Sequence, residues 1–205
     1  MFLLQRPSFE LLTAFIERSR ELPLSYAPIG LAKHAAAGFS LDLARGEIGR
    51  GEEDYARATT ALTEWRHFDL GWIEVFPPRA RVVEGAVVAV VVRHFGFWSI
   101  HGCRVLYTIH EEQPKQFGFA YGTLANHAES GEEIFKVALE EASATVFYEI
   151  RAVSRPRAAL ARLGYPIARH LQARFRRDSM AAMHSVRGGH DIQATGGSDP
   201  WQPSR

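Results

Sequence analysis

The chain begins with a hydrophobic pattern of helical period. Apolar side chains recur at three- and four-residue spacing after Pro7 and Ser8, and Pro23 closes the pattern. Such spacing places the apolar residues on one face and predicts an amphipathic helix. The residues of that face are Phe9, Leu12, Phe15 and Ile16. Residues 24–38 follow neither period and are punctuated by proline and glycine, so we expect irregular structure there.

A strand and a second helix are predicted next. Apolar and polar residues alternate from Phe39 to about Ile48, which is the two-residue period of a half-buried strand. Glycines at 49 and 51 turn the chain, and residues 52–54 are all acidic. Acids in a first turn favour a helix because they face the positive end of its dipole. We expect this helix to run to about His67, with an apolar stripe of Tyr55, Ala58, Leu62 and Trp65.

Strand-like patterns dominate residues 71–154. Six stretches rich in β-branched and aromatic residues are separated by short segments of turn-forming residues. The stretches are Gly71–Phe76, Ala86–Phe95, Trp98–His110, Gln116–Thr123, Glu132–Glu140 and Thr145–Val153. Connections this short join antiparallel neighbours, because a parallel crossover needs roughly a dozen residues or more. The sequence therefore predicts an antiparallel meander.

The C-terminal part is predicted to be one long helix followed by a tail. Ser154 can accept hydrogen bonds from the free N–H groups of a first turn, and Pro156 is tolerated there. We expect the helix to reach about Val186, with a kink or break at Gly164-Tyr165-Pro166. Its apolar face consists of Leu160, Leu163, Ile167, Leu171 and Phe175. Residues 1–186 are expected to form a single domain, and the glycine-rich, polar residues 187–205 a flexible tail.

This order of elements predicts an α+β domain of the helix-grip (START-like) type. A strongly curved antiparallel sheet has a concave apolar face, and the long C-terminal helix is the element able to cover it. A sheet wrapped round one helix leaves an apolar cavity for a small ligand wherever side chains do not fill the interior. Within Gln116–Thr123, one face is bulky, whereas the other carries Gly118, Ala120 and Gly122. The bare face allows close approach of the long helix, which we favour, or of a ligand.

Several short motifs are similar to a known family. They are Phe117-Gly118-Phe119-Ala120-Tyr121-Gly122-Thr123-Leu124, Gly131-Glu132-Glu133 with Phe135, Cys103-Arg104-Val105 with Tyr107, Tyr148-Glu149-Ile150, Ser154-x-Pro156 and Leu163-Gly164-Tyr165-Pro166. Together, from about Tyr26 to Met183, they resemble the bacterial and plant family called domain of unknown function 1990. The resemblance implies a family without an established activity, and it transfers no catalytic residue to this chain.

Composition narrows the function classes. Of the 205 residues, 46% are hydrophobic and 23% are charged, which fits a globular domain with a sizeable core. No apolar run reaches the roughly 18 residues of a membrane-spanning helix, and the first residues lack a signal-peptide pattern. The single cysteine, Cys103, excludes an intrachain disulfide, and its place in a predicted strand is typical of a small buried residue. We therefore expect a cytoplasmic protein without a membrane span.

Charge is unevenly distributed along the chain. Residues 1–150 hold 14 Lys and Arg against 20 Asp and Glu, whereas residues 151–205 hold 10 Arg against 3 Asp. A basic segment of this kind can contact phosphate or another anionic surface. It can also be a solvated helix face lying over an acidic body, which we favour. Aromatic residues for stacking on single-stranded bases are sparse there, so we expect no nucleic acid partner.

Six residues are candidates for ligand binding. They are Arg104, Tyr107, Tyr121, Thr123, His127 and Glu133. Glu133 shares a strand face with Phe135, and an acid at the start of a core-facing row must be solvated, paired or used. It is either an acid, base or anchoring group at a cavity rim, or a strand-end carboxylate in contact with water or turn N–H groups. We favour the second; its neighbour Glu132 is expected to point the other way.

Arg104 and His127 each have two interpretations. A mid-strand arginine either anchors an anionic ligand or pairs with an acid such as Glu133 or Glu149, and the sequence favours neither. A loop histidine near Tyr121 can shuttle a proton, because imidazole titrates near neutral pH. It can equally well cap a backbone carbonyl, which we favour for a histidine without a matched partner.

Three functions follow from these residues. The first is binding of a small apolar or lipid-like molecule between the sheet and the long helix. The second is an enzyme that uses the same cavity, a cyclase, dehydratase or hydrolase built on His127, Glu133, Tyr121 and Arg104. The third is an interaction protein that acts through the basic helix over residues 155–177. No cofactor or metal is expected, because the histidines lack metal-site spacing and the glycines lack that of a nucleotide-binding loop.

Overall fold

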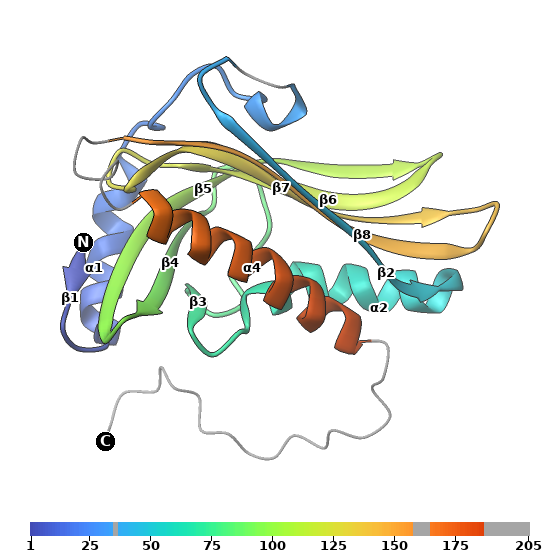
Figure 1. Ribbon diagram of the computed structural model, residues 1–205, viewed down its shortest axis with the longest axis horizontal. Coiled ribbons are helices and arrows are strands. Elements are labelled where there is room, and N and C mark those ends of the chain that lie inside the picture. The colour runs from blue at the N-terminus through green and yellow to red at the C-terminus, as the bar shows by residue number, and fades with distance from the viewer. Residues whose placement is uncertain (35–36, 158–164, 187–205) are drawn as a thin grey trace.

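The computed structural model describes residues 1–34, 37–157 and 165–186 (Figure 1). In chain order the elements are β1 (Phe2–Leu3), α1 (Phe9–Arg20), η1 (Leu31–Lys33), β2 (Ser40–Arg50), α2 (Gly51–Thr63), η2 (Arg66–Phe68), β3 (Ile73–Phe76), β4 (Val87–His94), β5 (Phe97–Glu112), β6 (Lys115–Thr123), β7 (Glu129–Glu140), β8 (Thr145–Pro156) and α4 (Tyr165–Ser185). Among these residues, no helix has both the length and the hydropathy needed to cross a lipid bilayer.

All strands belong to one antiparallel sheet. Seven of them are ordered β2-β8-β7-β6-β5-β4-β3, and the short β1 pairs with β5. The strands from β3 to β8 pair with their chain neighbours, which confirms the predicted meander. The sheet curves, and α4 lies across one of its faces (Figure 1). The predicted α+β helix-grip architecture, a curved antiparallel sheet around a C-terminal helix, is confirmed.

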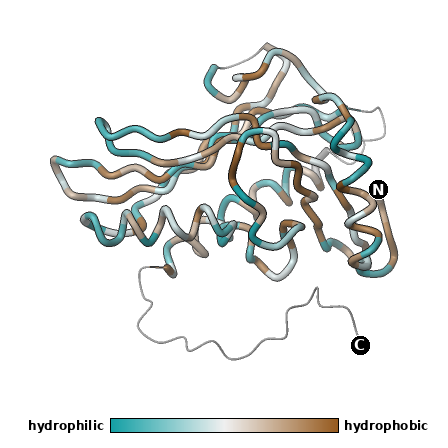
Figure 2. Tube along the Cα trace, turned by 180° about the vertical axis from the view of Figure 1, so that it is seen from behind, coloured by the Kyte–Doolittle hydropathy of each residue, from teal (hydrophilic) through white to brown (hydrophobic). Residues whose placement is uncertain are grey.

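The face of the sheet that packs on α2 and α4, here called the inner face, carries the main core. Alternate residues of each strand point to this side, as the two-residue period requires. The core includes Cys103, Val105, Phe119, Phe135 and Tyr148 from the strands, Leu62 from α2, and Phe175 and Met183 from α4. Cys103 is fully buried, as its position in the sequence indicates. Hydrophobic residues run through the middle of the sheet, whereas the tip of the long β5–β6 hairpin is hydrophilic (Figure 2).

The opposite, outer face is covered by the N-terminal part of the chain. Helix α1 packs Leu12 and Phe15 against Val91 and Ile100. Residues 24–33 follow it and pack on Leu106, Ala120 and Ile134. Both covers bury apolar side chains that would otherwise face water, so the predicted irregular segment is held firmly against the sheet.

The bare side of β6 faces this N-terminal segment and not the long helix. A Cβ atom added to Gly122 would lie 2.4 Å from the hydroxyl oxygen of Tyr26, so only glycine leaves room for that tyrosine. The bulky side chains of β6, Phe119 and Tyr121, belong to the inner core beneath α4. The prediction that the long helix approaches the bare face is therefore wrong.

The predicted start of the long helix is also wrong. Ser154 pairs with Ser40 on one side and Gly131 on the other, and Pro156 pairs with Glu129 at the end of β8. Pairing on both sides outweighs the local capping signal at Ser154. Helix α4 begins at Tyr165, where the sequence predicted a break. Two residues of the predicted apolar face, Leu160 and Leu163, and the predicted tail lie outside the described residues.

Candidate functional site

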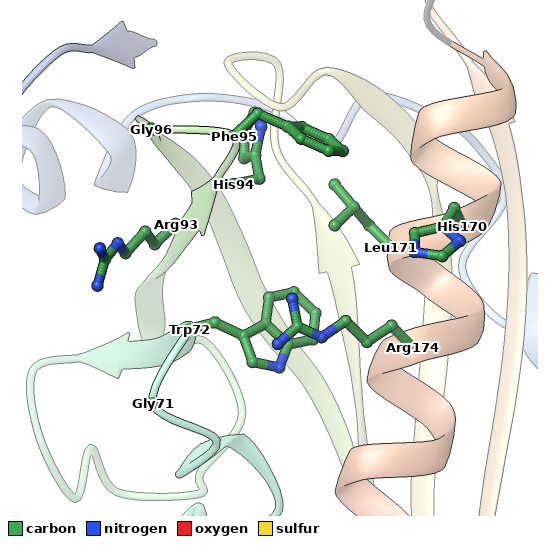
Figure 3. A pocket seen from close by; sticks show the side chains of 9 residues that line it. All are labelled: Gly71, Trp72, Arg93, His94, Phe95, Gly96, His170, Leu171 and Arg174. Carbon is green, nitrogen blue, oxygen red and sulfur yellow. The ribbon is translucent and has the colours of Figure 1, made fainter.

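A pocket of about 440 Å³ opens between the N-terminal half of α4 and one end of the sheet (Figure 3). It is lined by Gly71, Trp72, Arg93, His94, Phe95, Gly96, His170, Leu171 and Arg174. These residues come from the segment before β3, the end of β4, the β4–β5 turn and α4. Leu171 also packs against the inner core, so the pocket adjoins the space between sheet and helix. Its volume falls in the range of small-molecule sites, roughly 300–1,000 Å³.

The β4–β5 turn places an aromatic residue at the rim of this pocket. Phe95 and Gly96 have φ angles of 49° and 80°, and they connect the paired residues His94 and Phe97. Two consecutive residues with positive φ are typical of the tight turn that matches the twist of a hairpin. Glycine adopts this conformation freely, whereas a bulky residue such as phenylalanine is strained in it. Phe95 is 68% exposed, and its ring points toward α4 (Figure 3).

An arginine stacked on a tryptophan forms one wall of the pocket. The guanidinium carbon of Arg174 lies 4.3 Å from the centre of the Trp72 ring (Figure 3). Asp178 holds both partners, because its Oδ2 accepts hydrogen bonds from the indole Nε1 at 3.0 Å and from the arginine Nε at 3.2 Å. Stacking and the shared carboxylate together fix the plane of the guanidinium.

A chain of polar contacts leads inward from the pocket. The Nε2 atoms of His94 and His101 lie 3.2 and 2.9 Å from the hydroxyl oxygen of Ser99. The ring centroids of His101 and His127 lie 4.7 Å apart with the ring planes tilted by 45°, and Nδ1 of His127 accepts the backbone N–H of Glu129 at 2.9 Å.

Burial keeps these histidines neutral. It lowers the pKa of His94, takes the pKa of His101 well below its usual value, and lowers the pKa of His127 to about 4. Neutral imidazoles carry one donor and one acceptor each, so the chain can hold hydrogen bonds but no charge near neutral pH.

Glu133 faces inward, as the strand pattern indicates, and its carboxylate is paired with Tyr121. The phenol donates a hydrogen bond of 2.9 Å to Oε2 of Glu133. Burial raises the pKa of Glu133 to about 7, although the hydrogen bond from Tyr121 acts in the opposite direction. A carboxyl group that titrates near pH 7 can hold or release a proton under physiological conditions.

Ion pairs and hydrogen bonds tie residues 169–176 of α4 to the sheet. Asp42 on β2 accepts hydrogen bonds from Arg169 and forms an ion pair with Arg176 at 3.2 Å. Gln172 donates to both carboxylate oxygens of Glu129, at 2.9 and 2.8 Å. The described arginines of α4 therefore have acidic neighbours, which counts against a bare basic patch on this helix.

The structure places two of the predicted site residues on the outer face. Arg104 donates to the carbonyl oxygens of Arg20 at 2.8 Å and Leu22 at 3.0 Å, and so caps the end of α1. Tyr107 donates to Glu132 at 2.8 Å. Neither residue is brought together with Tyr121, His127 or Glu133. The acids considered as partners of Arg104 are engaged elsewhere, since Glu149 pairs with Arg45 and Lys136.

Thr123 is occupied with backbone groups. Its hydroxyl accepts the N–H of Gly131 at 2.9 Å, donates to the carbonyl of the same residue at 3.1 Å, and lies 2.6 Å from the hydroxyl of Ser25. It therefore joins β6, β7 and the N-terminal segment, which is a structural task.

Sequence reasoning missed the most deeply buried acid. Glu132 points outward as predicted, yet it is only 2% exposed. Its carboxylate accepts hydrogen bonds from the hydroxyls of Tyr26 and Tyr107 at 2.9 and 2.8 Å, and from the N–H of Gly30 at 2.8 Å. The bare glycine side of the neighbouring strand was the available signal, because such a face implies a close cover.

The pocket residues carried no recognisable motif. Trp72, His94 and the α4 residues His170 and Arg174 come from three segments that are distant in sequence, and these segments meet only because α4 crosses the end of the sheet (Figure 3). Within the described part of the chain, no three His, Cys, Asp or Glu side chains come together as a metal site would require.

Comparison of the sequence with known proteins identifies the family to which the chain belongs. The model of the family described as "Domain of unknown function (DUF1990)" matches residues 25–182. A UPF0548 protein of Dictyostelium discoideum is 30% identical over 203 residues, covering 89% of this chain and 94% of the relative. One from Deinococcus radiodurans is 34% identical over 192 residues, covering 85% and 92%. The relatives also include a protein of Arabidopsis thaliana, 33% identical over 71% of this chain and 72% of its own length.

Solved structures share the general arrangement at low sequence identity. A hypothetical protein of Helicobacter pylori matches with a TM-score of 0.49 and 8% identity, covering 79% of this chain and 95% of the other. Truncated norcoclaurine synthase of Thalictrum flavum matches with a TM-score of 0.47 and 8% identity, covering 77% and 99%. We transfer no ligand or activity from either protein.

Proposed function

We propose that this chain, which belongs to the family of domain of unknown function 1990, binds a small molecule in the pocket between α4 and the β4–β5 turn. The observation that carries the proposal is the pocket of about 440 Å³ with both apolar and polar walls. Trp72, Phe95 and Leu171 offer apolar surface, and a few polar groups at fixed positions orient a ligand.

The pocket lies beside the part of α4 that precedes the buried core residues of this helix. Phe175 and Met183 of α4 are buried in the inner core, so the C-terminal half of the helix packs directly on the sheet. The N-terminal half is held by polar contacts and borders the pocket through His170 and Leu171. A ligand entering there would extend inward along the histidine chain toward His127.

In this proposal the sequence-predicted residues divide into two groups. Tyr121, His127 and Glu133 belong to the inner side and would contact the inner end of a ligand. Arg104 and Tyr107 support the segments that cover the outer face, as their hydrogen bonds to Leu22 and Glu132 indicate.

Native mass spectrometry tests the proposal. The protein would be purified gently from its native source and weighed intact and after denaturation. We expect an excess mass in the intact protein that disappears on denaturation, and fragmentation of the released compound identifies its chemical class. An intact mass equal to that of the chain, combined with no binding of amphipathic probes, would contradict the proposal.

Two variants locate the ligand. Leu171→Trp adds bulk inside the pocket and is expected to remove the excess mass. Thr60→Trp is the matched control, because Thr60 lines a second, more open groove of about 730 Å³ between α2 and the end of α4. Loss of the ligand in the Thr60 variant, with retention in the Leu171 variant, would mean that the ligand binds in the groove between α2 and α4. That result would contradict the proposed pocket.

A cavity enzyme is the second candidate, and the Tyr121–Glu133 pair favours it. A carboxyl group with a pKa near 7, hydrogen bonded to a phenol, is suited to proton transfer in a cyclisation, dehydration or hydrolysis. Incubation of the identified ligand with the protein would then yield a product of different structure or mass. Glu133→Gln should abolish this conversion while ligand binding persists; conversion at the wild-type rate would exclude Glu133 as the acid or base.

A further inference from the structure

We infer that the ligand of this pocket is an amphipathic anion whose carboxylate or phosphate group binds to Arg174. This inference rests on the proposed function, because it concerns the same pocket. It adds the chemical class of the ligand: an apolar body placed against Phe95 and Leu171, with one acidic group at the Trp72–Arg174 wall.

The charge of the lining points to an anion. The described lining residues include two arginines and two histidines, but neither aspartate nor glutamate. The remaining lining side chains are the apolar Trp72, Phe95 and Leu171, besides two glycines. Arg93 points away from α4, so Arg174 is the arginine that faces the pocket (Figure 3). Together with the apolar walls, Arg174 matches a molecule that has an acidic end and a hydrophobic body.

The guanidinium of Arg174 is already held in a fixed orientation that suits this contact. Its Nε donates to Asp178, and its guanidinium is stacked on Trp72. Among the described residues, its two terminal nitrogens have no hydrogen-bond acceptor. A planar guanidinium presents paired donors that fit a carboxylate or a phosphate, and a guanidinium already held in place loses little entropy on binding.

Asp178 does not neutralise the site. The carboxylate lies between two arginines, because Arg177 also donates to it at 3.2 Å. The group of Arg174, Arg177 and Asp178 therefore keeps one net positive charge at this end of the pocket. Asp178 acts as the positioning residue, since its other partner is the indole Nε1 of Trp72.

Two imidazoles lie near Arg174, whereas the second lining arginine, Arg93, is directed elsewhere. His170 lies one helical turn before Arg174, so both side chains share the pocket side of α4. His94 lies across the pocket beneath Phe95 (Figure 3). The side chain of Arg93 points away from α4 (Figure 3) and lies beside the Trp98 ring. Arg174 is therefore the arginine whose removal tests the site.

Calorimetric titration with three ten-carbon probes separates the effect of the ligand's charge on affinity from the effect of its alkyl chain. Decanoate, decyl phosphate and decan-1-ol share the same alkyl chain and differ in the polar end. Hydrogen bonds to charged groups predict that an anionic probe binds about tenfold to a hundredfold more tightly than the alcohol. The tighter of decanoate and decyl phosphate identifies whether the natural acidic group is a carboxylate or a phosphate.

A pair of arginine variants assigns the charge effect to one residue. Arg174→Gln should weaken binding of the anionic probe about tenfold and leave decan-1-ol unchanged. Arg93→Gln is the matched control, because it removes the same charge from the second lining arginine, whose exposed side chain points away from α4 and lies beside the Trp98 ring (Figure 3). Thermal unfolding of both variants confirms that they remain folded.

The outcomes separate this inference from the function on which it rests. Equal affinity of the wild-type protein for decanoate and decan-1-ol would overturn the inference while pocket binding stands, and this comparison needs no variant. Equal weakening in the Arg174 and Arg93 variants would also overturn it. Binding of none of the three probes would overturn both the inference and the proposed function.

Discussion

His67 lies at the centre of the aromatic core, where an imidazole is not expected. Its side chain is fully buried, and its ring packs within 4.8 Å of Phe68 and 4.5 Å of Phe135, measured between ring centroids. Trp65 stacks parallel to it at 5.8 Å. Among the described residues, neither ring nitrogen has a hydrogen-bond partner. Burial lowers the pKa of His67 to about 3.

This pKa makes stability depend on pH in a defined direction. The folded pKa of about 3 lies below the unfolded value of about 6.5. The unfolded chain therefore binds a proton first, and stability is lost as the pH falls below 6.5. Linkage gives a loss of about 2 kcal/mol at pH 5 and about 5 kcal/mol below pH 3, relative to pH 8.

His67→Leu replaces the titratable imidazole with an apolar side chain of similar size. Urea unfolding of wild-type and variant protein at pH 8 and pH 5 measures the effect. We expect the wild type to lose about 2 kcal/mol more than the variant between the two pH values. Any constant packing cost of leucine cancels, because each protein is compared with itself.

The exposed His184 provides the control. His184→Leu is the matched histidine-to-leucine substitution outside the core, and we expect it to unfold at pH 8 and pH 5 with the same difference in stability as the wild type if burial of His67 is the cause. Equal losses of stability in the wild type and in the His67 variant would refute the reasoning. Such a result would mean that His67 is protonated as readily in the folded as in the unfolded chain.

Three further perturbations test other contacts of the fold. Glu132→Gln leaves two tyrosine hydroxyls and a backbone N–H without their carboxylate, and should lower the free energy of unfolding in urea by about 2–4 kcal/mol; a change below about 0.5 kcal/mol would show that the carboxylate contributes little. Gly122→Ala should lower it by about 1–3 kcal/mol, because the new methyl group meets the Tyr26 hydroxyl, and unchanged stability would mean that the tyrosine moves aside without cost. Asp42→Asn should speed amide hydrogen exchange in the N-terminal half of α4 by weakening its pairs with Arg169 and Arg176, while exchange in the central strands stays the same; equal acceleration throughout would indicate global destabilisation instead.

Much of the fold could be predicted because strand and helix periods are local properties of the sequence. The alternation in residues 71–153 predicted the meander, and the same parity correctly directed Glu133 inward and Glu132 outward. The helical spacing after Ser8 predicted α1, and the hydroxyl of Ser8 caps it by accepting the N–H of Leu11. Cys103 was predicted to be a small buried residue because it lies inside a predicted strand, and it is fully buried.

Local signals failed where a distant strand competed with them. Ser154 and Pro156 resemble the start of a helix, yet β2 and β7 lie on both sides of this segment and hydrogen bond with it as a strand. A single-sequence pattern contains the capping preference of a serine but not the presence of two open strand edges. The ladder formed with those edges satisfies more backbone groups than one helical turn would.

The candidate site shows the same distinction between what local sequence patterns determine and what distant segments determine. Strand parity directed Glu133 inward and Glu132 outward, but it left the face of Arg104 open, and only the structure separated Arg104 from Tyr121 and Glu133. The sequence did not determine what covers each face. Only the tertiary structure placed residues 24–33 over Glu132 and the N-terminal half of α4 beside Trp72. The periodicity of a strand is set by its own backbone, whereas its cover depends on where segments far away in the chain can bury their apolar surface.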